Sequence, residues 1–570
     1  IDVASGLSPS KKAYVEFVSP TEIAGFNQAG GFCEEDTDYT IHFVMQFSEK
    51  PEKTGTWKGR NQNEHSKLTS SGQDMGAWLR FKTEPGEKII VKTGISFVSI
   101  ANARENLQTE IPDWNFEAVK DQAFERWEGE LRKIEVVGNE DDMVKFYSSL
   151  YHTLIHPSIL NDVNGEYPAM KSGEIQKVTD RNQYHVYSLW DTYRTLHPLL
   201  TLVYPERQLD MVRTMADHVK HGGDLPFWEL GADETYVMNG DPAPIVVWDT
   251  YSKGIKDFNL PLIYQAMKKS AFDTTNNKIR PLQKYFSRHG FVPVDDTGPD
   301  DRWGKPRMVS ECLEYAYADW CIAQVAKTQG EDSIANYLER RSKAYEHYFD
   351  TTTGFLRPRY ADGSWYEPFE PSSYRGSWNN LGFVEGNSWQ YTFFVPHDID
   401  GLAHLMGGWD PFTQKLNQAF TEKNFTVDNE PDIAYPYLFT YAPNEGWRTQ
   451  QIIRELMDEE FGTGHGGLPG NDDAGTISAW FIFSALGFYP DCPGKPEYSL
   501  GSPLFKQIKI KLNPDFYNGE TLVITAPSNT NQTPFVREVT LRGKKIPDGK
   551  VSHEELVIGG KMSFSMVKEP

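Results

Sequence analysis

The sequence predicts an α+β protein in three parts. An antiparallel β-sandwich, apparently incomplete, spans 1–110, an (α/α)6 helical barrel spans 136–492, and strands return over 493–570. The first part shows alternating apolar and polar residues, the second a long series of amphipathic helices, and the third alternation again. A helix over 111–135 links the first two parts. We therefore expect a helical catalytic domain between two regions of strands.

The N-terminal strands are predicted from runs separated by Gly, Pro, Asn and Asp: AYVEFVS, YTIHFVMQF, GAWLRFK and KIIVKTGISFVSI. They are few for a closed sandwich. The first residues have neither an initiator Met nor the basic and apolar regions of a signal peptide. We therefore expect a trimmed product, and a missing N-terminal segment of the same protein as a partner. The segment FEAVKDQAFERWEGELRKIEV then has the period of an amphipathic helix.

About a dozen helices are predicted in the central part, among them DMVKFYSSLYHTLIH, APIVVWDTYSKGI, SWQYTFFVPHDIDGLAHLM and ISAWFIFSALGF. Long loops rich in Gly, Trp and charge join them. Helices in sequential pairs favour a toroid whose loops build a pocket at one end. A helical solenoid is the alternative, although no fixed repeat period is present. The predicted strands FKQIKIKL, TLVITAP, REVTLRG, HEELVIG and KMSFSM follow.

Composition excludes several classes of function. The chain of 570 residues has 80 acidic and 57 basic residues, a net charge of −23, which disfavours nucleic acid as a partner. No apolar run reaches the roughly 18 residues of a membrane span. Aromatic residues make up 13%, as in large cores and in clefts that stack sugar rings. Four cysteines without metal-site spacing are expected to be buried thiols: Cys33, Cys312, Cys321 and Cys492.

The most informative segment is LPGNDDAGTISAWFIFSALGFYP, from Leu468 to Pro490. A Gly-rich loop presents Asp472 and Asp473 immediately before an apolar helix. The positive end of the helix dipole is expected to keep Asp473 ionised. A rigidly held, ionised carboxylate suits a general base or a metal ligand. An ordinary helix N-cap is the alternative.

Two other loops combine carboxylates with aromatic residues. In SLWDTYR, stacking by Trp190 and a polar clamp from Asp191 and Arg194 would suit a sugar, and a structural Asp and Arg pair is the alternative. In GFVEGNSWQY, apolar neighbours are expected to desolvate Glu385 and raise its pKa, which favours a proton donor near Trp389. A carboxylate in the first turn of a helix is the alternative there.

A third loop, VDNEPD at 427–432, contains Asn429 and Glu430 and suits hydroxyl recognition or a cation that prefers oxygen ligands. A simple turn is the alternative.

His465 lies in a flexible Gly-rich stretch near the Asp pair, where it is either a substrate ligand or a solvated side chain. The spacing of histidines does not suggest zinc or iron. A desolvated Glu and an ionised Asp are the minimal pair for a glycosidase.

These segments together resemble glycoside hydrolase family 92, the calcium-dependent exo-acting α-mannosidases. The motifs that carry the resemblance are GISFVSIANARENLQTE, SLWDTYRTLHPL, EGNSWQYTFFVPHD, NEP and GGLPGNDDAGTISAWFIFSALGFYP. The resemblance covers nearly the whole chain. It implies a β-sandwich packed on an (α/α)6 barrel, an inverting mechanism and Ca²⁺ as cofactor.

The resemblance also implies roles for individual residues. Glu385 matches the general acid and Asp473 the general base, while Asn471 stands where some members have Asp. Glu430 and Asp472 are the candidate Ca²⁺ ligands. The candidate substrate-binding residues are Trp190, Asp191, Arg194, Trp389, Asn429, Glu430, His465 and Asn471. Members that cut α-1,2 links have His at the position of Asn429.

The sequence therefore predicts an inverting, Ca²⁺-assisted exo-α-mannosidase that acts on a mannose-containing oligosaccharide, from N-glycans or mannan. The alternatives are a mannose-phosphate phosphodiesterase of the same family and a non-catalytic glycan-binding protein. Because polymeric glycans occur outside the cytoplasm, we expect a periplasmic, cell-surface or secreted protein.

Overall fold

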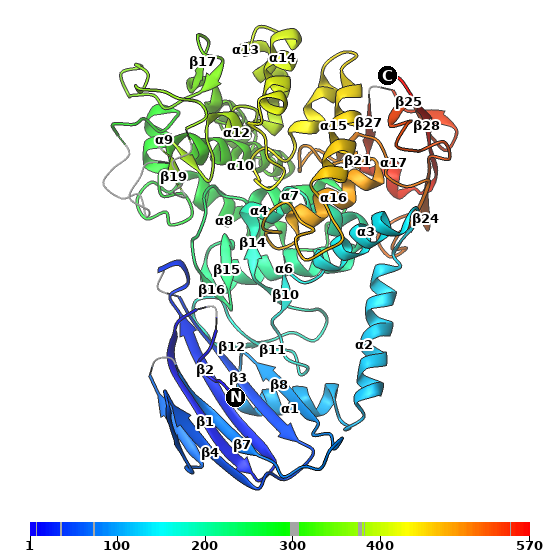
Figure 1. The fold of residues 1–570 in the computed structure, drawn as a ribbon. Helices are drawn as coiled ribbons and strands as arrows, with labels where there is room; N and C mark the ends of the chain where they lie inside the picture. Colours follow the sequence, from blue (N-terminus) through cyan, green and yellow to red (C-terminus); the bar gives the residue numbers. More distant parts are fainter. Residues whose placement is uncertain are drawn as a thin grey trace. The chain divides into compact units, whose positions relative to one another are not determined.

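The computed structural model describes residues 1–6, 8–34, 37–71, 74–296, 307–373, 379–380, 382–547 and 549–570 (Figure 1). The chain forms two compact units. The smaller unit comprises 1–130, 157–187 and 213–237, and the larger unit comprises 131–156, 188–212 and 238–570. Within the described ranges, no helix has both the length and the apolar character needed to cross a membrane.

The smaller unit is built on antiparallel sheets, as the alternating pattern predicts. The five-stranded sheet has the order β6-β1-β2-β3-β8, and a three-stranded sheet has the order β5-β4-β7. Apolar side chains from both sheets form one core that includes Val15, Ile23 and Met75. The strands are β1 (Ser10–Ser19), β2 (Glu22–Gly30), β3 (Asp38–Phe47), β4 (Lys53–Lys58), β5 (Asn61–Asn63), β6 (Lys67–Ser70), β7 (Met75–Arg80) and β8 (Val91–Ser96).

Two segments between residues 100 and 137 differ from the sequence predictions. The end of the predicted strand region is a helix, α1 (Ile100–Glu110), which Ser99 caps and which packs on β3 and β8. The predicted linker helix is α2 (Phe116–Leu131), none of whose residues is buried. Its last predicted residues instead form β9 (Ile134–Val137), which pairs with β23 (Gln507–Lys511). Pairing with a distant strand overrides the local helical period there.

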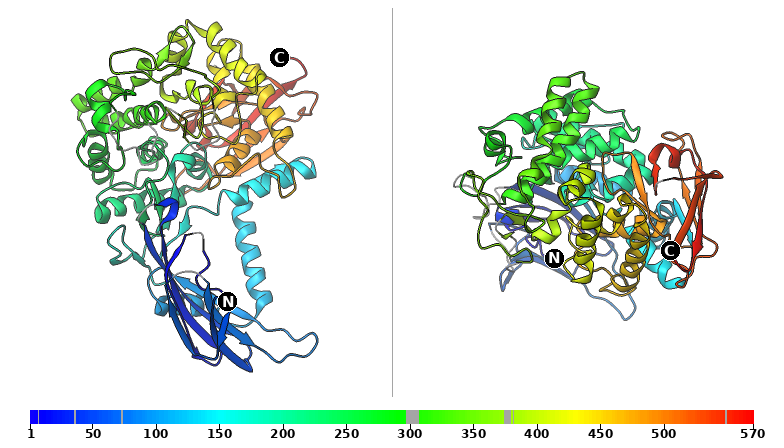
Figure 2. Two further views of the ribbon diagram at one scale, coloured as in Figure 1. Left: turned by 60° about the vertical axis from the view of Figure 1, so that its left-hand side comes forward. Right: turned by 90° about the horizontal axis from the view of Figure 1, so that it is seen from above.

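Helices dominate the larger unit (Figure 2). Every residue of α16 (Thr476–Leu486) is buried, and α10 (Met308–Thr328) is buried along nearly its whole length. The other helices are α3 (Glu140–His152), α4 (Leu189–Thr192), α5 (Leu196–Val203), α6 (Pro205–Gly222, which crosses the boundary between the units), α7 (Ala243–Ser252), α8 (Leu260–Phe272), α9 (Gln283–His289), α11 (Asp332–Arg341), α14 (Trp409–Thr421), α15 (Gly446–Glu459) and α17 (His553–Val557). The closed barrel of paired helices stays a prediction.

One predicted long helix is broken into short pieces. The segment from Ser388 forms α12 (Ser388–Thr392), a 3-10 turn, η3 (Pro396–Asp398), and α13 (Ile399–Leu405). Pro396 explains the break, because proline lacks the backbone N–H that a continuous helix needs.

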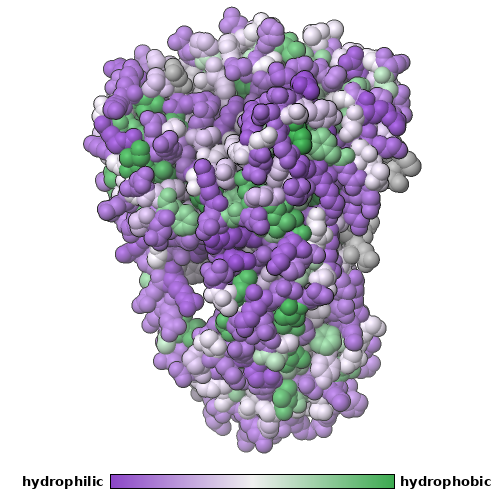
Figure 3. Space-filling view, turned by 180° about the vertical axis from the view of Figure 1, so that it is seen from behind, coloured by the Kyte–Doolittle hydropathy of each residue, from purple (hydrophilic) through white to green (hydrophobic). Residues whose placement is uncertain are grey.

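Four of the five predicted C-terminal strands belong to a mixed sheet of order β26-β25-β28-β24-β23-β9 beside the helices (Figure 2). Its strands are β23 (Gln507–Lys511), β24 (Thr521–Thr525), β25 (Phe535–Leu541), β26 (Lys544–Lys545) and β28 (Gly560–Val567). The prediction of a strand in HEELVIG is wrong, because His553–Val557 form α17, which Ser552 caps. Hydrophilic residues cover most of the face shown in Figure 3. Three cysteines are buried as expected, but Cys33 is exposed, so that part of the prediction is wrong.

Candidate active site

Glu385 lies in a sharp turn between a short strand, β20 (Phe383–Val384), and α12. Its φ is 45°, a left-handed conformation that non-glycine residues rarely adopt. Burial, and then the negative charge of Asp473, raises the pKa of Glu385 to about 7, while Arg307 acts in the opposite direction. Near neutral pH such a carboxyl can both give and take a proton.

The helix-start alternative for Glu385 does not apply in the structure. The N-cap of α12 is Asn387, whose side chain accepts from Trp389 N at 2.9 Å and Gln390 N at 3.3 Å. Because another residue satisfies those donors, the Glu385 carboxylate remains available for chemistry. Its loop is held by Asn429, whose Nδ2 donates to the Glu385 backbone carbonyl at 2.7 Å.

Asp472 and Asp473 have different environments although they are adjacent. The Asp472 carboxylate accepts from Ser478 N in the first turn of α16 at 2.8 Å, so the helix-capping role belongs to Asp472. Asp473 has a φ of 45°, and the next two residues, Ala474 and Gly475, are also left-handed. This sharp reversal turns the Asp473 side chain away from the helix that follows it.

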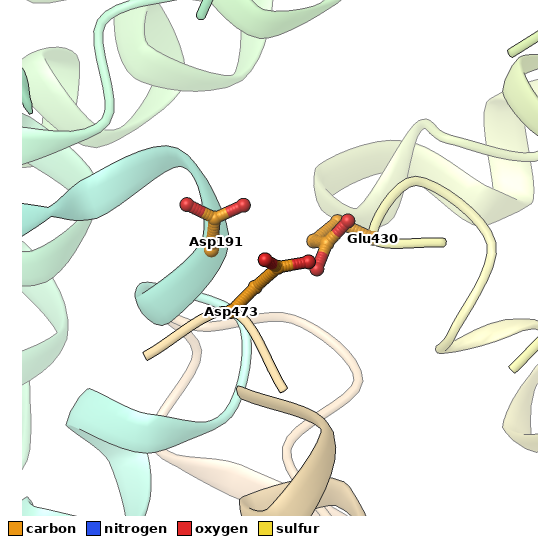
Figure 4. Close-up of side chains that lie close together, drawn as sticks. All are labelled: Asp191, Glu430 and Asp473. Carbon is orange, nitrogen blue, oxygen red and sulfur yellow. The ribbon is translucent and has the colours of Figure 1, made fainter. Parts of the chain in front are cut away.

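Asp191, Glu430 and Asp473 form a compact carboxylate cluster (Figure 4). One oxygen atom from each lies within 4.8 Å of the others. Asp191 belongs to α4, where it accepts a hydrogen bond from Ser188 Oγ. Glu430 lies in the loop after α14. Sequence analysis named all three residues but did not predict that they meet.

Burial, and after it the crowding of negative charge, raises the pKa values of the three carboxyls in this cluster. Burial, and then the charge of Asp473, raises the pKa of Asp191. Burial, and then the charge of Asp191, raises the pKa of Glu430. Burial also raises the pKa of Asp473, although a hydrogen bond with Glu430 acts in the opposite direction. The pKa of Asp473 is therefore raised, which is opposite to the direction in which the helix dipole acts.

An unpaired buried oxygen atom is a second observation that supports a cation at this cluster. Oε1 of Glu430 is buried and has no hydrogen-bond partner among the described residues. An unpaired buried carboxylate oxygen is costly, and a hard cation with oxygen ligands would satisfy it. Of the two predicted metal ligands, Glu430 belongs to the cluster, whereas Asp472 lies outside it and caps α16.

A cavity of about 710 Å³ opens beside the cluster, a volume typical of ligand pockets. It brings together both proposed catalytic residues with Asn429, Glu430 and Asn471. Among the described residues, its lining is Ser372, Glu385, Asn387, Gln390, Lys423, Asn424, Thr426, Asp428, Asn429, Glu430, Asn471 and Asp473. Hydroxyl, amide and carboxylate groups predominate, which suits a ligand rich in hydroxyl groups.

The predicted sugar clamp is instead a structural assembly. Trp190 is only 1% exposed, and its ring stacks on the Arg194 guanidinium at 4.8 Å. Arg194 in turn donates to Glu314 of α10 at 2.8 Å. Trp389 is 7% exposed and packs edge-on against Phe355 at 4.6 Å. Neither of these two tryptophans nor Arg194 is among the described residues that line the cavity.

His465 is exposed and is not among the residues that line the cavity. Conversely, the sequence analysis missed Ser372, Lys423, Asn424 and Thr426. Asn387, Gln390 and Asp428 lie within motifs that were recognised, so their proximity could have suggested them. Lys423 and its neighbours follow α14 in a loop whose only recognisable pattern, the Asn-x-Thr acceptor at Asn424, does not indicate a catalytic site.

The model of the glycosyl hydrolase family 92 catalytic domain matches residues 102–568, and that of the family's N-terminal domain matches residues 1–96. An uncharacterized secreted glycosidase of Arthroderma benhamiae is 26% identical over 529 residues. The match covers 87% of this chain and 63% of that protein, so the chain spans less than two thirds of this curated relative.

Two solved structures from Bacteroides thetaiotaomicron are similar along nearly the whole chain. A family GH92 α-mannosidase in complex with mannoimidazole has a TM-score of 0.91 and 29% identity, covering 100% of this chain and 76% of that one. A family GH92 inverting mannosidase has a TM-score of 0.89 and 28% identity, with coverages of 98% and 77%.

Proposed function

Because the chain belongs to glycosyl hydrolase family 92, we propose that it is an exo-α-mannosidase. It would remove terminal α-linked mannose from N-glycans or mannan with inversion and with the help of Ca²⁺. The observation that carries the proposal is that Glu385 and Asp473 line one cavity, next to a carboxylate cluster suited to a cation. The relatives described as α-mannosidases support the choice of sugar.

In this proposal, Glu385 is the general acid. Its proton passes to the glycosidic oxygen as the bond to the anomeric carbon breaks, so the leaving group departs as a neutral alcohol. The pKa of about 7 leaves a large share of Glu385 protonated at neutral pH. This raised pKa supports proton donation, which a phosphodiester substrate would not need.

Asp473 is the proposed general base. It accepts a proton from a water molecule that attacks the opposite face of the sugar, which gives inversion. One Asp473 oxygen belongs to the carboxylate cluster, and Asp473 also lines the cavity in which the sugar would bind. The ionised form is required, and positive charge among Asp191, Glu430 and Asp473 would favour it.

Asp191, Glu430 and Asp473 would hold the Ca²⁺ ion. When bound, Ca²⁺ supplies positive charge and coordination sites for sugar hydroxyls. Asn429 and Asn471 line the same cavity and offer amide groups to the remaining hydroxyls. We also propose an extracytoplasmic location, supported by the secreted fungal relative. Fractionation of the native cells would test it, and recovery in the cytoplasm would contradict it.

The decisive experiment follows hydrolysis of α-linked mannobioses by proton NMR, first with Ca²⁺ and then with excess chelator. We expect β-mannose as the initial product, loss of turnover on chelation, and recovery when Ca²⁺ is restored. Initial release of α-mannose would overturn the roles of Glu385 and Asp473. Absence of turnover with every dimer would contradict the proposed activity.

A further inference from the structure

A second cavity, of about 570 Å³, lies in the larger unit between the start of α15 and strands β25 and β26. Figure 1 shows α15 beside β25. The two elements are in contact, and each forms one wall of this cavity. Trp447 packs edge-on against Phe535 at 6.5 Å, and Gln450 Oε1 accepts from Val536 N at 2.8 Å. Among the described residues, this cavity and the cavity of Glu385 have no lining residue in common.

An irregularity in β25 places Arg537 in this second cavity. Val536 pairs with Met566 of β28 and Glu538 pairs with Ser565, so Arg537 is an extra residue without a partner in the register. Such a bulge re-aims a side chain. Arg537 is exposed, and no carboxylate among the described residues forms an ion pair with it.

The neighbouring charges do not neutralise Arg537. Glu538 lines the same cavity but is already paired with Lys545 at 3.3 Å. Among the residues that the structure describes, the three charged ones that line this cavity, Arg537, Glu538 and Lys545, leave one positive charge in excess. This local excess is notable in a chain whose net charge is −23.

Neutral hydrogen-bond donors surround the same space. The Gln450 side chain accepts a bond through its oxygen, which leaves its amide N–H groups available. Asn444, held in a left-handed turn with a φ of 62°, also lines the cavity. The first residue of α15, Gly446, opens into it, and the Glu445 side chain does not cap that helix. The side-chain amides of Gln450 and Asn444 therefore offer hydrogen-bond donors to a ligand in this cavity.

We propose that this cavity binds a saccharide that carries an oxyanion, either a carboxylate or a phosphate. The planar fork of Arg537 suits bidentate binding of such a group. The amides of Gln450 and Asn444 suit sugar hydroxyls, and Pro443 and Ile546 offer apolar surface to the ring. The site is separate from the cavity of Glu385, so this proposal does not rest on the proposed hydrolysis.

Calorimetric titration of the whole chain would test the proposal with four probes: glucose 6-phosphate, glucuronic acid, glucose and inorganic phosphate. Glucose-based probes avoid the cavity proposed for mannose. Salt at about 0.15 M limits the influence of distant charges, because the Debye length is then about 8 Å. We expect at least one of the two acids to bind about tenfold more tightly than glucose, and the tighter acid identifies the anionic group.

Two variants decide whether Arg537 is responsible. Arg537→Gln should weaken binding of the acid about tenfold or more, because a charged hydrogen bond is lost. Lys544→Gln removes an equal charge from an exposed residue of β26 outside the cavity lining, and should change binding less than about twofold. Hydrolysis of mannobiose by Arg537→Gln should be unchanged, because Arg537 lies outside the cavity of Glu385.

Four results would overturn the proposal. The first three are binding of neither acid, binding of glucose as tight as that of the acids, and equal weakening of acid binding by both variants. Inorganic phosphate binding as tightly as glucose 6-phosphate would exclude a saccharide site. None of these results depends on whether the chain hydrolyses mannosides.

Discussion

Replacing the proposed acid, Glu385→Gln, tests the mechanism most directly. Glutamine preserves the size of the side chain but cannot donate a proton of comparable acidity. At pH 7 a carboxyl with the ordinary pKa of 4.5 would be protonated in about one molecule in 300. With the pKa of about 7 that Glu385 has, about half of the molecules are protonated, so burial enlarges the active fraction about 150-fold.

The expected loss depends on the leaving group. General acid catalysis contributes about 100- to 10,000-fold, so Glu385→Gln should lose about this much kcat/KM on a mannobiose. An aryl mannoside with an acidic phenol as leaving group needs little protonation and should lose much less. A matched control, Glu459→Gln, changes an exposed carboxylate at the end of α15 and should leave both rates unchanged.

The pH profile supplies a second readout of the same group. Because the protonated form of Glu385 is the active one, kcat/KM for mannobiose should fall as pH rises above about 7. Glu385→Gln has no proton to lose, so this alkaline limb should disappear. Equal losses on mannobiose and aryl mannoside, together with an unchanged alkaline limb, would refute the acid assignment.

Three further predictions test the base, the cation and the turn before α16. Asp473→Asn should lose activity on both mannobiose and aryl mannoside, since each needs an activated water; an active variant with native circular dichroism would exclude this base. Ca²⁺ should raise the Tm of the wild type, and Glu430→Gln should greatly reduce that rise; an undiminished rise would place the ion elsewhere. Gly475→Ala should lower the free energy of unfolding by about 1–2 kcal/mol in a denaturant titration, because its φ is 92° and a Cβ would lie 3.0 Å from Thr153 Cα. Gly464→Ala, with open space around its Cβ, is the control for that titration, and an equal loss there would refute the steric argument.

The sequence predicts those parts of the fold that depend on local periodicity. Alternation in YTIHFVMQF identifies β3, and the apolar run after Gly475 identifies α16. The N-terminal sheets, the helical domain and the C-terminal strands are confirmed. The short strand β9 was missed because its stability comes from pairing with β23, a partner far along the chain.

Motifs identify the candidate site only in part. The individual loops of Glu385, Glu430 and Asp473 are recognisable, because each combines carboxylates with turn residues. Their meeting with Asp191 depends on tertiary packing, which no local spacing encodes. The same limitation explains Trp190 and Arg194, which look like a sugar clamp in sequence but stack on each other in the core.

The left-handed backbone at Glu385 and Asp473 has a consequence for how this protein evolves. Both residues have a φ of 45°, a conformation that costs roughly 1–2 kcal/mol for residues other than glycine. Glycine at either position would relieve that strain and remove a partly buried carboxylate, so such a variant should fold more readily. Selection for robust folding and selection for catalysis therefore act in opposite directions at these two positions. In a lineage freed from its substrate, these two carboxylates would be among the first residues to drift.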